Sequence, residues 1–216
     1  MSVPKHHRTS RRNRIQVLVL SAAAAAMPFS MTAADQPEPE KGDRSITEFK
    51  KEEDAKFQWT VVDDGVMGGL SKGKMAIVDA GVLRFEGVLS LENNGGFSSI
   101  RTGRFDTMDL AAHKGLVLRV KGDGRTYQVR LETDARFRGA MAVSFSADLP
   151  TTKGEWTEVK VPFKNFRGSW RGRDLPDAKF DPGKIQRLGL LLGDKKPGPF
   201  RMEVDWIRAY GGAKDK

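Results

Sequence analysis

The sequence predicts an all-β fold, a sandwich of two sheets built from short strands. Apolar and polar residues alternate with a period of two, most clearly over 127–132 and 141–146. Turn residues such as Asp-Gly, Asn-Asn-Gly-Gly and Pro-Gly-Pro separate the alternating segments, and 23 glycines suit many tight turns. No long apolar stripe of helical period follows Phe57. Because one large sheet would leave a face in water, we expect two packed sheets in a jelly-roll arrangement.

The first 34 residues predict a targeting segment. Basic residues come first, an apolar run covers 15–29, and small residues follow at 30–34. This order is typical of a signal peptide cut after Ala34, whereas a mitochondrial transit peptide spreads its arginines along an amphipathic helix. The run is short for a membrane span and contains Pro28, so no transmembrane span is expected after cleavage. We expect a periplasmic or secreted protein, with a mitochondrial location as the alternative.

The remaining chain carries little net charge. The whole sequence has 37 Lys and Arg against 28 Asp and Glu, a net charge of +9. The first 34 residues hold 5 basic residues and no acid, which leaves 32 against 28, or +4. The basic excess therefore belongs mainly to the targeting segment and does not predict a nucleic-acid partner. Without cysteine, the chain has no disulfide, no thiol catalysis and no cysteine-bound metal.

The elements expected after the targeting segment follow in order. Residues 35–56 are charged and contain proline, with only Ile46 and Phe49 as large apolar side chains, which predicts a flexible linker. A jelly-roll domain is expected over 57–210 and a short tail over 211–216. The predicted strands lie near 57–62, 74–78, 82–88, 96–102, 115–121, 126–132, 140–147, 156–161, 185–192 and 200–209.

Residues 68–75 nearly match a phosphate-binding loop. They read G-x-x-x-x-G-K, but Met75 stands where that loop needs Ser or Thr. The residues that follow read as strand, turn and strand, so no helix N-terminus would face a phosphate. We interpret the stretch as a glycine turn that enters a strand, and we expect no cofactor.

Two loops combine Asp or Asn residues with paired glycines, one within 59–73 and one within 90–101. Their carboxylates, amides and hydroxyls, with a closely approachable backbone, would suit sugar hydroxyls, calcium or a polypeptide. The same residues can also simply form turns with positive φ.

Support for catalysis is weak. After the targeting segment the only histidine is His113, and neither a nucleophile elbow nor a metal-type histidine pair occurs. Two facing carboxylates could hydrolyse a glycosidic bond, but no pair stands out. We therefore expect no enzyme activity and no metal. Trp170 lies in a basic loop and could be an exposed platform for a sugar ring.

Motifs in the second half of the chain form a specific series. They include G-D-G-R-T-Y at 122–127, G-E-W-T-E-V-K-V-P-F at 154–163, L-G-L-L-L-G-D-K at 188–195 and G-P-F-R-M-E-V-D-W-I at 198–207. In this order they closely resemble the complex I intermediate-associated protein 30 family, over about 57–210. The resemblance implies a galactose-binding-like jelly roll without enzyme activity. It also implies a role like that of the mitochondrial members, which help to assemble respiratory complex I.

The two glycine loops also fit this resemblance, because bacterial-looking members carry D-D-G-V-M-G-G and E-N-N-G-G-F, here at 63–69 and 92–97. The leading hypothesis is an exported, protein-binding assembly or chaperone-like factor, possible partners being subunits of a membrane complex. The alternatives are a carbohydrate-binding module of the cell envelope and, third, an envelope enzyme. The candidate partner- or ligand-binding residues are Asp63, Asp64, Gly65, Met67, Gly68, Gly69, Ser71, Asn93, Asn94, Gly95, Gly96, Phe97, Arg101, Arg125 and Tyr127.

Overall fold

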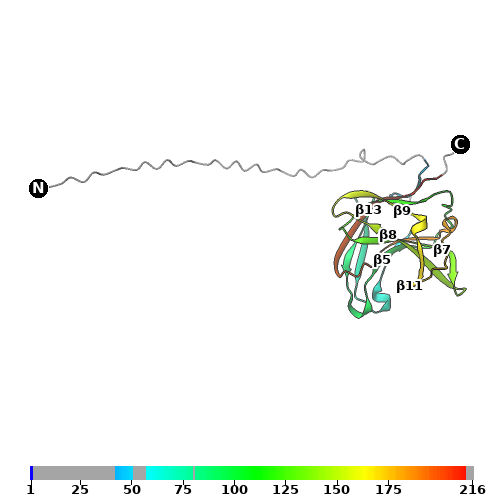
Figure 1. Cartoon of the computed structure of the whole chain (residues 1–216), viewed down its shortest axis with the longest axis horizontal. Coiled ribbons are helices and arrows are strands. Elements are labelled where there is room, and N and C mark those ends of the chain that lie inside the picture. The colour runs from blue at the N-terminus through cyan, green and yellow to red at the C-terminus, as the bar shows by residue number, and fades with distance from the viewer. Residues whose placement is uncertain (2–41, 51–56, 80, 213–216) are drawn as a thin grey trace. The chain divides into compact units, whose positions relative to one another are not determined.

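Two antiparallel sheets face each other across one core (Figure 1). The computed structural model describes residues 1, 42–50, 57–79 and 81–212. The all-β jelly-roll prediction is confirmed. The predicted targeting segment, apart from Met1, lies outside the described residues, as does most of the predicted tail.

The strands are arranged in a six-stranded and a seven-stranded sheet. The first sheet has the order β3 (Lys72–Val78), β4 (Val82–Leu89), β13 (Gly198–Tyr210), β6 (Gly115–Lys121) and β9 (Trp156–Pro162), with β1 (Arg44–Thr47) also beside β13. The second has the order β11 (Arg173–Asp174), β10 (Arg167–Trp170), β8 (Met141–Pro150), β7 (Thr126–Phe137), β12 (Arg187–Leu192), β5 (Ser98–Thr102) and β2 (Trp59–Asp63). Short 3-10 turns are η3 (Asp64–Met67), η4 (Glu92–Asn94), η5 (Phe163–Asn165) and η6 (Pro182–Lys184).

Every strand predicted from the sequence is present, with its ends shifted by a few residues. Three observed strands, β1, β10 and β11, were not predicted. Both β10 and β11 are too short to show an alternating pattern, and Gly168 interrupts the first of them. β10 forms because backbone groups at the edge of β8 need hydrogen-bond partners, and residues 167–169 supply them. β11 then pairs with β10.

The strand β1 lies inside the range predicted as a flexible linker, of which the structure describes residues 42–50. Arg44 and Ser45 pair with Ala209 and Arg208 of β13, while Ile46 and Phe49 are buried. β1 and β4 pair with the same side of β13. β4 lies beside the N-terminal part of β13, and β1 lies beside its C-terminal part. Composition gave the wrong result here because β13 supplies both backbone partners and a core that two apolar side chains can enter.

Alternation along each strand separates the core from the solvent-facing surfaces. In β12, Leu188, Leu190 and Leu192 point inward and are buried, whereas Arg187, Gly189 and Leu191 occupy the outer face. The outer face of the seven-stranded sheet is consequently polar, and the loops leaving the sandwich are held by a rigid scaffold.

We expect Ile46→Ala to lower the free energy of unfolding by about 2–4 kcal/mol, because it empties a buried site between β1 and the core. Urea denaturation of the purified chain measures this change. Ser45→Ala, an exposed position in the same strand, should change stability by less than about 0.5 kcal/mol. Equal effects of the two substitutions would contradict a structural role for β1.

Candidate functional site

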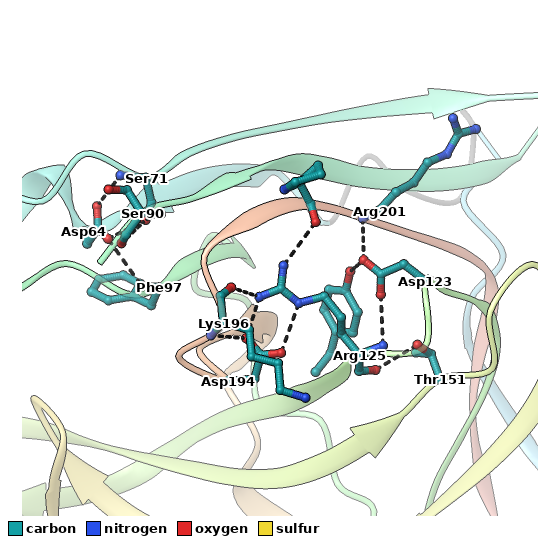
Figure 2. A network of polar contacts seen from close by, with 12 residues as sticks. Asp64, Ser71, Ser90, Phe97, Asp123, Arg125, Thr151, Asp194, Lys196 and Arg201 are labelled. Carbon is teal, nitrogen blue, oxygen red and sulfur yellow. Dashed lines mark hydrogen bonds and ion pairs between the residues drawn. The ribbon is translucent and has the colours of Figure 1, made fainter. Parts of the chain in front are cut away.

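Asp64 fastens the two glycine loops to each other (Figure 2). It begins η3, which is the cyan helical turn in Figure 1. One carboxylate oxygen accepts from the Ser71 backbone N–H at 2.9 Å, and the other accepts from the Ser71 hydroxyl at 2.6 Å. That second oxygen also accepts from the N–H groups of Gly96 at 2.7 Å and Phe97 at 3.3 Å. The loops predicted to act together are therefore in contact.

The Asp64 carboxylate is ionised although its residue is fully buried. Burial alone would raise its pKa, but the hydrogen bond from the Ser71 hydroxyl and those from three backbone N–H groups outweigh this effect. The net result is a pKa below the ordinary 3.8. Because every one of these donors belongs to the chain, the Asp64 carboxylate holds the two loops together.

Asp63 makes a second set of contacts on the neighbouring strands. Its carboxylate accepts from the Gly73 N–H at 2.9 Å and from the Ser98 hydroxyl at 2.5 Å. The pair of aspartates thus connects the end of β2 to the starts of β3 and β5. Both carboxylates are committed to hydrogen bonds within the fold.

The glycines around Asp64 leave the space that its carboxylate needs. A Cβ on Gly69 would lie 2.3 Å from Asp64 Cγ, and a Cβ on Gly95 would lie 2.6 Å from Asp64 Oδ2. Asn93 and Asn94 adopt positive φ values of 54° and 58°, so the turn interpretation of the Asn-Gly pairs is confirmed. Gly68 ends η3 and β3 begins at Lys72, which also confirms the turn-and-strand interpretation of 68–75.

Large apolar side chains are exposed on these fastened loops. Val66 and Met67 on η3 are 73% and 62% exposed, and Val88 at the end of β4 is 54% exposed. Ser71 accepts a hydrogen bond from the Ser90 N–H at 3.0 Å, which brings the segments around Leu70 and Leu91 together. We define the loop surface as Val66, Met67, Leu70, Val88 and Leu91, all of them exposed.

An open depression of about 550 Å³ borders this surface, lined by residues 88–92 and Pro197. Pro197 belongs to the turn between β12 and β13. Arg125 holds this turn through hydrogen bonds of 2.6 and 3.0 Å to the two Asp194 oxygens (Figure 2). Its guanidinium also donates to the carbonyls of Pro199 and Lys196. Arg125 therefore positions one wall of the depression.

Tyr127, another predicted binding residue, lies in the core. Its residue is fully buried, and its hydroxyl donates to Asp123 at 3.1 Å. Burial, followed by the negative charge of Asp123, raises the pKa of the phenol well above its ordinary value. Asp123 also accepts from the Arg201 N–H at 2.9 Å, so Tyr127 helps to hold β7 against β13.

The remaining predicted residues differ in their placement. Gly65, Met67, Gly68, Asn93 and Asn94 are exposed on the two loops. Arg101 is exposed on the outer face of β5 and makes no contact with the Asp64 network. The residues that sequence reasoning missed are Val66, Leu70, Val88, Leu91 and Pro197. One pattern pointed to the first two: in V-M-G-G-L, at 66–70, apolar residues flank turn glycines and do not belong to an alternating strand.

The alternatives depend on other parts of the structure. Trp170 is half-buried, with its ring centroid 5.6 Å from that of Phe137 and 5.3 Å from the Arg171 guanidinium carbon, so it is not a bare platform for a sugar. Across the described ranges, no three His, Cys, Asp or Glu side chains gather in a way that could bind a metal ion. A search of the described part of the chain finds no helix long and apolar enough to span a membrane.

Fold and site together define an all-β module with fastened loops and an apolar rim. The chain belongs to the complex I intermediate-associated protein 30 family, whose model matches residues 47–204. It is 32% identical over 186 residues to "Complex I intermediate-associated protein 30, mitochondrial" from Mus musculus, covering 77% of this chain and 56% of that one. The Drosophila melanogaster protein of the same name is 28% identical, with 77% and 62% covered. The matches thus span little more than half of the curated relatives.

Solved structures share the fold at low sequence identity. A family 11 carbohydrate-binding module from Clostridium thermocellum, in complex with a mixed-linked tetrasaccharide, superposes with a TM-score of 0.60 and 12% identity. The superposition covers 82% of this chain and all of that one. Identity this low establishes the shared sandwich and does not transfer the sugar site.

We expect Asp64→Asn to lower the free energy of unfolding at pH 7 by roughly 2 kcal/mol, because the amide turns a donor toward backbone N–H groups. The pKa of Asp64 is lowered by folding, so its stabilisation is present above the ordinary value of 3.8 and is lost as pH falls through the lower folded value. Urea denaturation at several pH values should therefore show the two stability curves converging below pH 3.8.

Asp106→Asn is the matched control, because Asp106 is exposed. It should leave stability nearly unchanged throughout. A difference between wild type and Asp64→Asn that does not vary with pH would contradict the structural role of the ionised carboxylate.

Proposed function

We propose that the chain is a non-catalytic, protein-binding assembly factor that contacts its partner through the loop surface. One observation carries this proposal: Val66, Met67 and Leu70 are exposed on a loop that buried hydrogen bonds hold in place. Single exposed apolar side chains are common, but several grouped on one surface favour an interaction site. A fixed loop also loses less conformational entropy on binding than a mobile one.

The family supports a protein partner. Its relatives are named for association with complex I intermediates, which favours a protein partner for this chain. The loop surface matches such a target by chemistry, and the neighbouring depression offers space for one apolar side chain. Asn93 and Asn94, exposed beside it, can supply hydrogen bonds at the rim.

The location of the protein is part of this proposal. The basic and apolar order of residues 1–34 favours export, whereas the curated relatives are named as mitochondrial. We propose export with cleavage after Ala34. In that location the loop surface would reach subunits on the outer side of a bacterial membrane.

Expression of the full chain with a C-terminal tag should yield a product that begins at Asp35 and fractionates with the periplasm or the medium. N-terminal sequencing and cell fractionation test this expectation. An uncut product, or one recovered in the cytoplasm, would contradict export and leave a mitochondrial location as the better explanation.

The shared sandwich supports a second candidate function, binding of carbohydrate. Trp170 was its expected platform, but Phe137 and Arg171 contact that ring. An enzyme acting through two carboxylates is the third possibility, and Asp63 and Asp64 do not support it, because both accept hydrogen bonds from the fold. Protein binding therefore has the most direct support.

Met67→Ser together with Leu70→Ser should reduce recovery of complex I subunits with the tagged protein by roughly tenfold or more, because each removes apolar area from the contact. Quantitative mass spectrometry after mild cross-linking measures recovery. Ile77→Ser is the matched control, since Ile77 is an apolar residue 40% exposed on β3, outside the loop surface.

Three results would count against this function. Equal recovery of subunits with both variants would separate binding from the loop surface. Recovery of a glycan alone would favour the carbohydrate-binding alternative. Finally, loss of recovery with Ile77→Ser as well would indicate a general effect on folding.

A further inference from the structure

A second surface, on the outer face of the seven-stranded sheet, carries a different chemistry. Pairing brings one residue from each of six adjacent strands into a single row across the sheet. The row consists of Thr60, Arg101, Gly189, Arg130, Ser146 and Arg167. Ile100, Leu190 and Val129 beside them are buried, so this row points away from the core.

Gly189 separates two arginines at the centre of the row. Arg101 and Arg130 each pair with it, so their Cα atoms lie roughly 10 Å apart, two strand spacings. A Cβ on Gly189 would lie 2.9 Å from the Ile100 carbonyl oxygen and 3.3 Å from Arg101 Cβ. Gly189 is buried, and any side chain there would collide with β5, so only glycine fits between the two arginines.

Neither arginine has a carboxylate partner among the described residues. Arg130 is half-buried and donates to the Ser144 hydroxyl at 2.7 Å, and no side-chain bond of Arg101 is found in that same part of the chain. Burial lowers the pKa of Arg130, Glu132 opposes the shift, and the charge of Arg101 adds to it. Two cations thus lie close together without a matching anion.

The acidic groups nearby are already occupied. Glu132 accepts from Arg187 at 3.1 Å and from Arg104 at 3.3 Å. Asp148, on β8, lies within 3.4 Å of the Gln128 amide nitrogen. Among the described residues, neither of these carboxylates forms an ion pair with Arg101 or Arg130.

We propose that Arg101 and Arg130 bind a carboxylate of an acidic polypeptide segment laid across this face. Guanidinium groups pair with carboxylates in a two-bond geometry, and two of them can hold one group from both sides. Arg101 is exposed and Arg130 is half-buried, whereas Ser99 and Gly189 are buried, so the ligand would meet the guanidinium groups and not the backbone of the sheet. No aromatic ring occupies the outward positions of the described β5 and β12, which favours a polypeptide over a sugar.

The probe for this site is a fluorescein-labelled peptide of alternating Gly and Glu, with the Gly-Gln peptide as its neutral counterpart. Binding to the purified chain is followed by fluorescence anisotropy at low ionic strength, where charge pairing is least screened. We expect the acidic peptide to bind and the neutral one not to bind. Arg101→Gln should weaken binding roughly tenfold, the loss of one charge-assisted pair.

Matched variants separate this site from general charge effects. Arg173→Gln removes the same charge from an exposed position on β11 and should leave affinity unchanged. Arg101→Lys keeps the positive charge but loses the planar guanidinium that donates two parallel hydrogen bonds to a carboxylate. It should therefore retain part of the affinity. Met67→Ser should bind the peptide normally, because this site is independent of the loop surface; the two proposals can therefore fail separately.

Several outcomes would overturn the inference. One is failure of the acidic peptide to bind, and another is equal loss with Arg101→Gln and Arg173→Gln. Inorganic phosphate and polygalacturonate are the competing probes. If either binds in an Arg101-dependent manner while the peptide does not, the ligand is an anion of that other class, and the proposal of a polypeptide is wrong.

Discussion

The buried carboxylate of Asp64 is the interaction on which the functional end of this protein depends. It gathers donors from Ser71, Gly96 and Phe97, which come from two loops that each connect one sheet to the other. A buried charge is tolerated only where hydrogen bonds replace its hydration. The loops must therefore keep these positions, and residues between the donors are forced outward. The exposure of Val66 and Met67 follows from this constraint.

Arg125 provides the complementary constraint on the same end of the sandwich. Its ion pair with Asp194 fixes the turn that carries Pro197, and Tyr127 and Asp123 connect β7 with β13. The Asp64 and Arg125 networks hold different loops, and both loops contribute residues to the walls of one depression. In this arrangement Arg125 is paired with Asp194, and Asp64 is held by hydrogen bonds from neutral donors, so both groups stabilise the loops around the depression.

The molecule presents two surfaces with opposite character on one scaffold. The loop surface is apolar, and the outer face of the seven-stranded sheet carries Arg101 and Arg130 without carboxylate partners among the described residues. A sandwich of similar fold binds a mixed-linked tetrasaccharide in a solved complex, yet the row across this sheet consists mainly of arginine, serine and glycine. The fold thus fixes where surfaces lie, whereas the residues on them decide which ligand is recognised.

The sequence by itself determined the sheet architecture, because period-two alternation and turn glycines are local signals that each strand carries. It also identified the two loops and their turn geometry, since Asn93, Asn94 and Gly68 have local backbone preferences. It could not reveal that Asp64 and Tyr127 are buried or that Ile46 joins β13. Those facts depend on partners far away in the chain. Only the tertiary structure decides which polar groups find each other, and therefore which side chains remain free to bind.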